Sequence, residues 1–178
     1  IAGLGGLGSN IAMYLARAGV GHLHLVDFDK VDITNLNRQQ YDIADLGTLK
    51  TDALTKNIKR FNPFIEITSQ CVKVNEDNAA EIFGGYKIVC EAFDKAENKA
   101  MLVNSILSEC GDTKIVSGSG MAGFGSSNTI VTRKINDRFY LCGDAESDMN
   151  DGLALVAPRV AICAAHEANM ILRLLIGE

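Results

Sequence analysis

The first thirty residues alternate between helical and extended patterns of apolar positions. Apolar side chains at Ile11, Ala12, Leu15 and Ala16 have helical spacing, which predicts a helix that follows a cap at Ser9 and ends near residue 19. The apolar run over residues 22–26 then predicts a buried strand. The residues before the helix have the character of a strand end, so the chain is expected to open inside a strand-helix-strand unit, trimmed at its N-terminus and without a signal peptide.

The same alternation continues through the middle of the chain. It predicts helices over residues 49–61, 77–83 and 96–109, and strands over residues 65–72, 87–92 and 114–117. Residues 30–47 are polar and have no sustained period, which indicates a long excursion beyond the end of a strand. Long loops in that position are usually functional, so residues 30–47 are the first candidates for a site.

The pattern changes after residue 117. The glycine-rich segment 118–127 predicts a loop, and residues 128–134 and 138–142 predict an antiparallel pair of strands around Asn136-Asp137. Pro158 is suited to open a last helix, which carries a regular apolar stripe. We therefore expect one α/β domain over residues 1–178, with a mixed sheet that is parallel in its N-terminal part, antiparallel in its C-terminal part, and covered by helices on both faces.

Charge and cysteine content remove several classes of function. The net charge is −5 and no basic run stands out, which disfavours a nucleic-acid partner. The apolar runs are far shorter than the roughly 20 residues that cross a membrane. Five scattered cysteines without a C-x-x-C pair indicate a reducing cytoplasm and no structural zinc. Cys71 and Cys90 lie in strand-like runs and are expected to be buried, and the three histidines have no ligand spacing.

A glycine motif between a strand and a helix indicates a Rossmann-like phosphate cradle. Gly3-x-Gly5-x-x-Gly8 lets phosphate oxygens approach backbone N–H groups at a helix N-terminus, and Asp27 at the end of the next strand suits a ribose hydroxyl. Many nucleotide-binding proteins share this motif, including NAD enzymes. The motif therefore predicts a nucleotide and leaves its identity open.

The segment after Asp27 separates these nucleotides. It carries a second carboxylate and a cluster of amide and cationic side chains, namely Asp29, Asn35, Arg38, Gln39 and Lys50. Hydride transfer has no need of that set, whereas phosphoryl or adenylyl transfer needs it because charge develops on the phosphates. An NAD-dependent oxidoreductase and a non-catalytic nucleotide sensor are the rival hypotheses, and a solvated polar loop is the structural alternative.

The ordered motifs Gly-Leu-Gly-Gly-Leu-Gly-Ser, Ala-Gly-Val-Gly, Val-Asp-Phe-Asp and Asn-Leu-Asn-Arg-Gln resemble the ThiF/MoeB family, which is related to ubiquitin-activating enzymes. The resemblance covers nearly the whole chain and is strongest to the compact ThiF branch. It implies an ATP-dependent adenylyltransferase that attaches AMP to the C-terminal Gly-Gly carboxylate of a ubiquitin-like, ThiS-like sulfur-carrier protein in thiamine biosynthesis. Activation of a molybdopterin-synthase carrier and modification of tRNA are alternatives within the family.

The resemblance also implies roles for individual residues. Gly6 would contact the ATP phosphates, Asp27 would hold the ribose, and Asn35, Arg38 and Gln39 would face the triphosphate. Lys50 would neutralise the departing pyrophosphate, and Asp94 would bind magnesium, although an Asp after a strand is also a common helix cap.

Three further expectations concern the partners. The resemblance implies a homodimer in which a partner arginine reaches the site. Cys142 lies near a cysteine that links some members to the carrier, but nothing in the sequence lowers the pKa of its thiol, so an inert cysteine is the preferred interpretation. The loop 118–127 and the strands after it are candidates for docking the carrier's tail, and a plain connection is the alternative.

Overall fold

The computed structural model describes residues 1–147 and 152–178. Within them, the strands are β1 (His22–Val26), β2 (Glu66–Gln70), β3 (Ile88–Glu91), β4 (Lys114–Gly118), β5 (Val131–Lys134) and β6 (Phe139–Gly143). The α-helices are α1 (Gly6–Arg17), α2 (Lys50–Lys59), α3 (Ala79–Phe83), α4 (Ala96–Glu109) and α5 (Ala157–Ile176). Short 3-10 helices are η1 (Ile33–Asn35), η2 (Ile43–Asp45) and η3 (Ser127–Thr129).

The strands form a mixed sheet, as the sequence predicts. β1 pairs with β2, β3 with β4 and β4 with β6 in parallel, and β5 closes one edge antiparallel to β6. Ala2 lies between the two halves, because it forms parallel bridges to both Val26 and Glu91. The residues before the glycine motif thus occupy the central strand position that a β-α-β unit requires.

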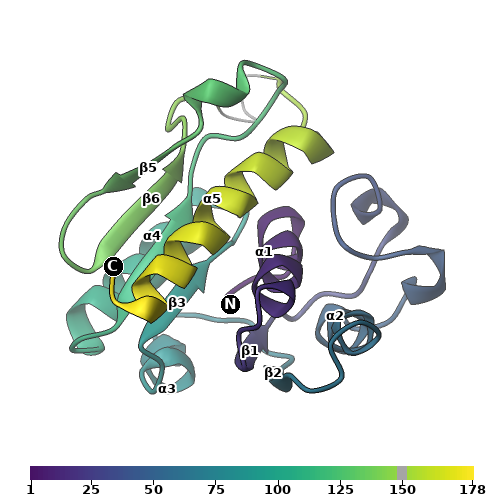
Figure 1. Ribbon diagram of the computed structural model, residues 1–178, viewed down its shortest axis with the longest axis horizontal. Coiled ribbons are helices and arrows are strands. Elements are labelled where there is room, and N and C mark those ends of the chain that lie inside the picture. Colours follow the sequence, from purple (N-terminus) through teal and green to yellow (C-terminus); the bar gives the residue numbers. More distant parts are fainter. Residues whose placement is uncertain (148–151) are drawn as a thin grey trace.

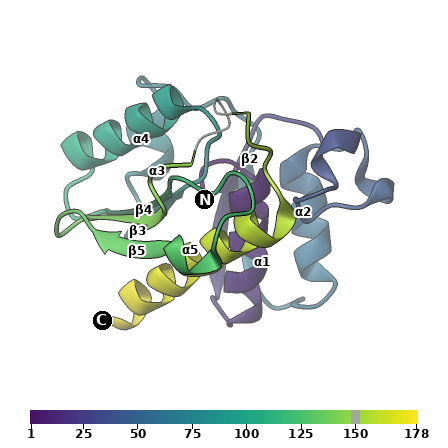
Figure 2. The same ribbon diagram turned by 90° about the horizontal axis from the view of Figure 1, so that it is seen from above.

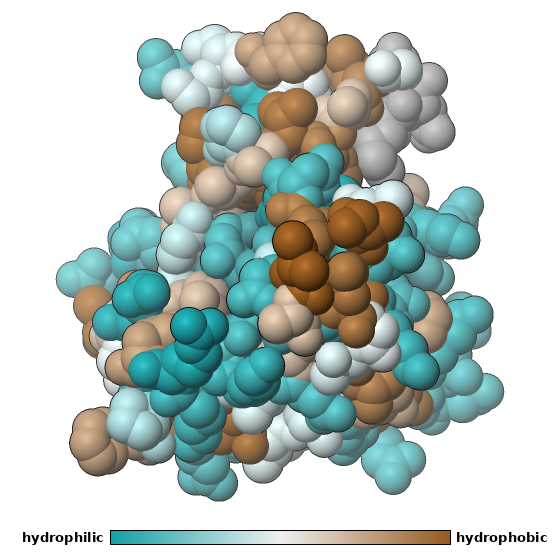
Figure 3. Space-filling model, turned by 90° about the vertical axis from the view of Figure 1, so that its right-hand side faces the viewer, coloured by the Kyte–Doolittle hydropathy of each residue, from teal (hydrophilic) through white to brown (hydrophobic). Residues whose placement is uncertain are grey.

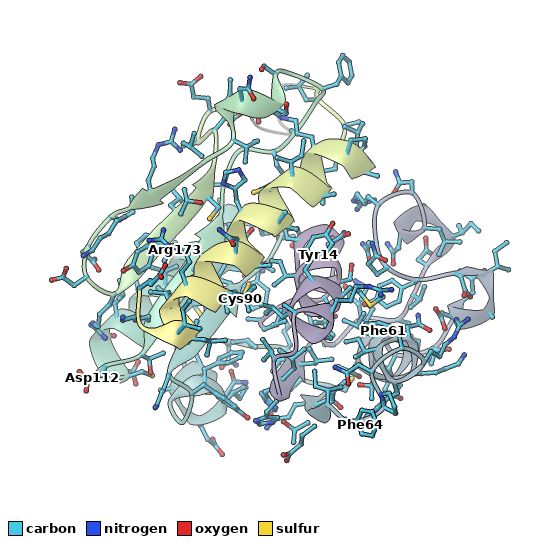
Figure 4. The ribbon with its side chains drawn as sticks, in the orientation of Figure 1. Tyr14, Phe61, Phe64, Cys90, Asp112 and Arg173 are labelled. Carbon is cyan, nitrogen blue, oxygen red and sulfur yellow. The ribbon has the colours of Figure 1, made fainter. Side chains whose placement is uncertain are left out.

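Helices cover both faces of the sheet, with α1, α2 and α5 on one side and α3 and α4 on the other (Figures 1 and 2). Two apolar clusters fill the space between the sheet and the helices, one on each face. Adjacent strand residues belong to different clusters: Leu25 packs on the face covered by α1 and α5, and Val26 on the face covered by α3 and α4. This alternation follows from the pleat of a strand. Figure 4 shows Cys90, a buried strand residue, behind α5.

The predictions for Ser9 and Cys71 are wrong. Ser9 does not cap the first helix, because α1 begins three residues earlier, at Gly6, and the Ser9 hydroxyl donates to the Gly5 carbonyl at 2.6 Å. The glycine motif therefore forms the first turn of the helix itself. Cys71 is exposed, because it follows β2, an edge strand whose residues are largely exposed.

The excursion 30–47 is more ordered than its polar sequence indicates. Asp32 caps η1 and Asp42 caps η2, each by accepting from backbone N–H groups. Ile33, Ile43 and Leu46 are nevertheless exposed. Figure 3 views the molecule from the side on which this excursion lies in Figure 1, and apolar side chains gather there on a largely polar face.

The last helix has one carboxyl side chain in the apolar core. Glu167 of α5 is fully buried, and its oxygens lie 3.6 Å from the Cys90 thiol and 3.8 Å from the Cys163 thiol. Burial raises the pKa of Glu167 to about 8, and this shift is opposed by Lys99 and reinforced by Glu91. No helix among the described residues has both the length and the apolar character to cross a membrane.

Replacing Glu167 with glutamine is expected to remove a pH dependence of stability. Because the folded-state pKa lies above the unfolded value, folding takes up a proton, and wild-type stability falls as pH rises from about 4.5 to about 8. The free energy of unfolding of Glu167→Gln relative to wild type should therefore rise between pH 5.5 and 8 by about 3 kcal/mol, at about 1.4 kcal/mol per pKa unit. Denaturant titrations at both values measure it, with exposed Glu97→Gln as control. An equal change in the free energy of unfolding between the two pH values for wild type and Glu167→Gln would contradict the prediction.

Candidate functional site

The glycine motif forms a tight turn at the carboxyl ends of β1 and β3. Gly3 has a φ of +88°, and a Cβ atom there would lie 2.9 Å from the Ala92 carbonyl oxygen. A Cβ on Gly8 would overlap the Gly3 carbonyl at 1.8 Å. Gly5 is the N-cap of α1 and has no side chain to occupy the first-turn N–H groups. The turn therefore presents an open helix N-terminus, which is suited to an anion.

The Asp27 side chain stabilises this turn by hydrogen bonds. Its Oδ2 atom accepts from the Leu4 N–H at 2.6 Å, and its Oδ1 atom accepts from the Asp29 N–H at 2.7 Å. Burial raises the pKa of Asp27, while Lys50 and the two backbone N–H groups oppose that rise. Since Asp27 is only 8% exposed, its first role is to fix the shape of the glycine turn.

Asp29 is the more accessible carboxylate of the pair. Its side chain is half exposed, and its Oδ2 atom lies 3.0 Å from the Nζ atom of the buried Lys50. The Lys50 N–H also donates to the Asp29 carbonyl at 3.0 Å, so the start of α2 is fixed to the end of β1. The structure thus brings together three of the predicted residues, Asp27, Asp29 and Lys50.

Arg38 and Gln39 lie against the glycine turn. Arg38 Cδ would be 3.7 Å from a Cβ on Gly6, and Gln39 Nε2 would be 3.8 Å from one on Gly5. Arg38 Nη1 donates to the Thr34 carbonyl at 3.0 Å, but the buried Arg38 Nε and Gln39 Oε1 atoms have no partner among the described residues. The Arg38 Nε atom is an unpaired buried donor beside an open helix N-terminus and fits an anionic ligand, whereas Gln39 Oε1 is an acceptor and suits a ligand N–H or O–H group.

Asn35 shapes the loop that carries these two side chains. Its carbonyl accepts from the N–H groups of Arg38 and Gln39, and its Oδ1 atom accepts from the Asp32 N–H at 3.0 Å. A cleft of about 410 Å³ opens beside this loop, and Arg38 and Gln39 line it together with the first turn of α5. Its size is within the range of small-molecule sites.

Asp94 is exposed on the turn between β3 and α4, next to the glycine turn. The cap position of α4 is Lys95 and makes no side-chain cap, so the alternative of Asp94 as the helix cap is not supported. Among the described residues no group of three or more metal-ligating side chains occurs. One carboxylate beside a phosphate cradle does suit magnesium, because that ion is commonly held by one or two carboxylates plus substrate phosphates and water.

Comparison with known proteins identifies the family of this chain. Residues 1–178 match the ThiF family. The chain belongs to the ThiF family. The resemblance seen in the sequence is thereby confirmed.

Two relatives of this ThiF-family chain are fungal. The adenylyltransferase and sulfurtransferase UBA4 of Eremothecium gossypii is 38% identical over 122 residues, which are 68% of this chain and 27% of that protein. UBA4 of Saccharomyces cerevisiae is 30% identical over 185 residues, which cover 99% of this chain and 41% of that protein. The chain thus spans less than half the length of these curated relatives.

Among solved structures, E. coli tRNA N6-threonylcarbamoyladenosine dehydratase, TcdA, in complex with ATP has a TM-score of 0.87 at 23% identity. The match covers 98% of this chain and 84% of that chain. At this identity the likeness shows the fold, and it confirms the predicted Rossmann-like architecture.

Sequence reasoning missed the residues that join the excursion to α1 in this ThiF-family chain. Asn10 Nδ2 donates to the Arg38 carbonyl at 3.0 Å, and its Oδ1 atom accepts from Gln40 at 2.7 Å. The Gln40 N–H donates to the Ser9 hydroxyl, and the Tyr41 hydroxyl donates to the Leu4 carbonyl at 2.8 Å. The available signal was a polar pair, Ser9 and Asn10, in a helix that is otherwise apolar on its buried side.

Hydrogen bonds hold the glycine-rich loop 118–127 in place, which disfavours a plain flexible connection. Arg159, in the first turn of α5, donates to the carbonyls of Gly125 and Ser126 at 2.9 and 2.7 Å. Its Nη2 atom lies 2.5 Å from Asp144 Oδ2 and also donates to the Thr129 hydroxyl. The neighbouring residue, Val160, would contact a Cβ on Gly6 at 3.2 Å, so one helical turn contacts both the loop and the cradle.

Cys142 has the environment of an inert thiol. It is fully buried on β6, and burial, followed by Glu167, raises the pKa of its thiol to about 12. The Thr132 hydroxyl lies 3.4 Å from its sulfur and 3.1 Å from His166 Nδ1. Among the described residues, no cationic group contributes to the pKa of the Cys142 thiol, so nothing there stabilises a thiolate.

Proposed function

We propose that this chain is an ATP-dependent adenylyltransferase that activates the C-terminal Gly-Gly carboxylate of a ubiquitin-like sulfur-carrier protein. The observation that carries the proposal is Arg38, whose side chain lies against Gly6 at the open N-terminus of α1 and whose buried Nε donor has no partner among the described residues. Adenylyl transfer develops negative charge on the α-phosphate and on the leaving pyrophosphate, and preorganised donors lower the barrier most where charge develops. Hydride transfer develops no negative charge on the phosphates, so it does not require such donors.

The geometry supports a distribution of roles around ATP and magnesium. The glycine turn and Arg38 would hold the phosphates, with Asn35 shaping the loop and Gln39 completing its polar surface. Asp29, the exposed carboxylate, would accept from the ribose in place of Asp27, which is engaged in bracing the turn. Lys50, released from Asp29, would neutralise pyrophosphate, and Asp94 would hold magnesium.

The carrier's carboxylate is itself the nucleophile in this reaction, and it forms an acyl-phosphate bond to AMP as pyrophosphate departs. No protein nucleophile or general base is required, so catalysis consists of positioning and charge stabilisation. The buried Cys142 has no part in this step. The loop that Arg159 holds is joined to the turn of α5 whose Val160 lies against Gly6, and it would receive the tail of the carrier.

The carrier itself is the open part of the proposal. UBA4 is named an adenylyltransferase and sulfurtransferase, which supports a sulfur carrier as substrate. The resemblance implies a ThiS-like carrier in thiamine biosynthesis, and a molybdopterin-synthase carrier or a tRNA substrate is the alternative within the family. We also infer a homodimer from the resemblance.

ATP–pyrophosphate exchange with a panel of ubiquitin-like carriers, including a ThiS-like protein and a molybdopterin-synthase carrier, tests the proposal. We expect exchange with one carrier that depends on its Gly-Gly terminus, and a melting temperature that rises with Mg-ATP because ligand binding stabilises the folded state. Carriers that lack the last glycine are the matched control. A larger rise with NADH than with Mg-ATP would refute the proposal in favour of an oxidoreductase, and ATP binding without exchange would favour a sensor.

A further inference from the structure

The carboxylate of Glu91 has a complete set of hydrogen-bond donors. It lies at the end of β3 and is fully buried. Its Oε1 atom accepts from the Phe93 N–H at 2.6 Å, and Lys99 Nζ lies 3.3 and 3.1 Å from its two oxygens. The Ser117 hydroxyl donates to Oε2 at 2.5 Å. Because a carboxylate offers about four acceptor positions, Glu91 has none left for a ligand, and its role concerns the protein around it.

These bonds surround the turn that carries Asp94. Glu91 begins the turn, Lys99 lies one helical turn into α4, and Ser117 lies on the adjacent strand β4. The Phe93 N–H group, within the turn, is fixed by Glu91 itself. Asp94, the next residue, makes no side-chain hydrogen bond among those found in the described residues. The backbone that Glu91 holds therefore sets the position of Asp94.

The same turn contacts the phosphate cradle. A Cβ on Gly3 would lie 3.1 Å from Phe93 Cδ1, and one on Gly8 would lie 3.3 Å from Ala92 Cβ. The Ala92 N–H donates to the Ala2 carbonyl at 2.8 Å, just before the glycine turn begins. Any displacement of the turn would therefore change the spacing between Asp94 and the cradle.

We propose that Glu91, held by Lys99, is a positioning residue that fixes the turn carrying Asp94 against the glycine turn, where the Asp94 carboxylate would bind the magnesium ion that accompanies ATP. The inference rests on the proposed function. A buried ion pair is a poor source of stability compared with apolar residues of the same volume, because both ions lose their hydration. Groups that orient a metal-ligating side chain typically change metal affinity by about 10- to 100-fold when they are removed.

The test measures magnesium binding by its effect on the melting temperature, so it does not depend on catalytic turnover. The melting temperature is measured at saturating ATP while MgCl₂ is titrated, for wild type, Glu91→Gln, Asp94→Asn and the double variant. We expect the magnesium concentration at half-effect to rise roughly 10- to 100-fold in Glu91→Gln, and the response to be lost in Asp94→Asn. The double variant should behave as Asp94→Asn alone, since Glu91 acts through Asp94. Glu97→Gln, at an exposed position in the first turn of α4, is the control and should resemble wild type.

Lys99 provides a second pair of variants if Glu91→Gln does not fold. Lys99→Arg keeps the charge and should retain the magnesium response, whereas Lys99→Gln should weaken it. A folded Glu91→Gln or Lys99→Gln with the wild-type half-effect concentration would overturn this inference and leave the proposed function standing. If neither ATP nor Mg-ATP changes the melting temperature of the wild-type protein, the proposed function itself is refuted.

Discussion

Arg38→Ala is expected to lower the rate of adenylyl transfer by roughly 100- to 1,000-fold, about 3–4 kcal/mol of transition-state stabilisation, which is the effect of removing one preorganised donor from an anion site. The structure gives the reason, because the side chain lies along Gly6 and its buried Nε has no partner in the described residues. Single-turnover transfer of AMP to the carrier, at saturating Mg-ATP, measures the rate.

Arg38→Lys is the matched variant, and it should recover little of the rate because an ammonium cannot reproduce the planar fork of donors. Arg38 Nη1 also holds the Thr34 carbonyl and the Asn37 side chain, so Arg38→Ala should cost about 1 kcal/mol of stability, the usual worth of a hydrogen bond. Transfer within a few-fold of wild type by folded Arg38→Ala would contradict the assignment, and an unfolded protein would show that Arg38 is structural.

Arg159→Met is expected to be the most destabilising of these substitutions, by about 3–5 kcal/mol, because it leaves one member of a buried ion pair without its partner. The side chains of Arg159 and Asp144 are only 5% and 11% exposed. Burial opposes ionisation of Asp144, yet hydrogen bonds from Ser147, Glu146 and Arg159 lower its pKa to about 2. The carbonyls of residues 125 and 126 would also lose their donor.

Chemical denaturation at pH 7 measures this loss, with Arg173→Met as the control. Arg173 is on the same helix, and its contact with Glu178 is long and exposed, so its replacement should change stability by no more than about 0.5 kcal/mol. Because the pKa of Asp144 is depressed, the stability it contributes is present above pH 4 and disappears as the pH falls toward 2. The cost of Arg159→Met should shrink over that interval. Equal effects of Arg159→Met and Arg173→Met at pH 7 would refute the prediction.

The elements of the fold were predictable because their signals are local. The apolar run of β1 and the stripe of α5 after Pro158 each follow from the period of one segment, and the structure confirms both. The start of α1 was not predictable from cap preferences. Gly5 and Gly6 are poor helix formers, but an open first turn requires residues without side chains, and this tertiary demand overrides propensity.

The proximity of some candidate site residues was predictable from the sequence, whereas the hydrogen bonds that hold them were not. The grouping of Asp27, Asp29 and Lys50 follows from the rule that ligands gather at the carboxyl ends of parallel strands. The anchoring of Asp94 by Glu91 and Lys99 depends on a carboxylate buried between β3, β4 and α4. No spacing in the sequence indicates which carboxylate will lose its solvent, so such a residue is found only from the packed structure.

The first turn of α5 has a thermodynamic consequence. Arg159 holds the glycine-rich loop while the adjacent Val160 packs at Gly6, so a small shift of that turn moves the loop and the cradle together. If a carrier tail settles on the loop and shifts α5, it changes the affinity for nucleotide, and linkage requires nucleotide to change the affinity for the tail by the same factor. Under the proposed function, nucleotide and carrier tail would then bind cooperatively through two consecutive side chains, with no contact between the two ligands.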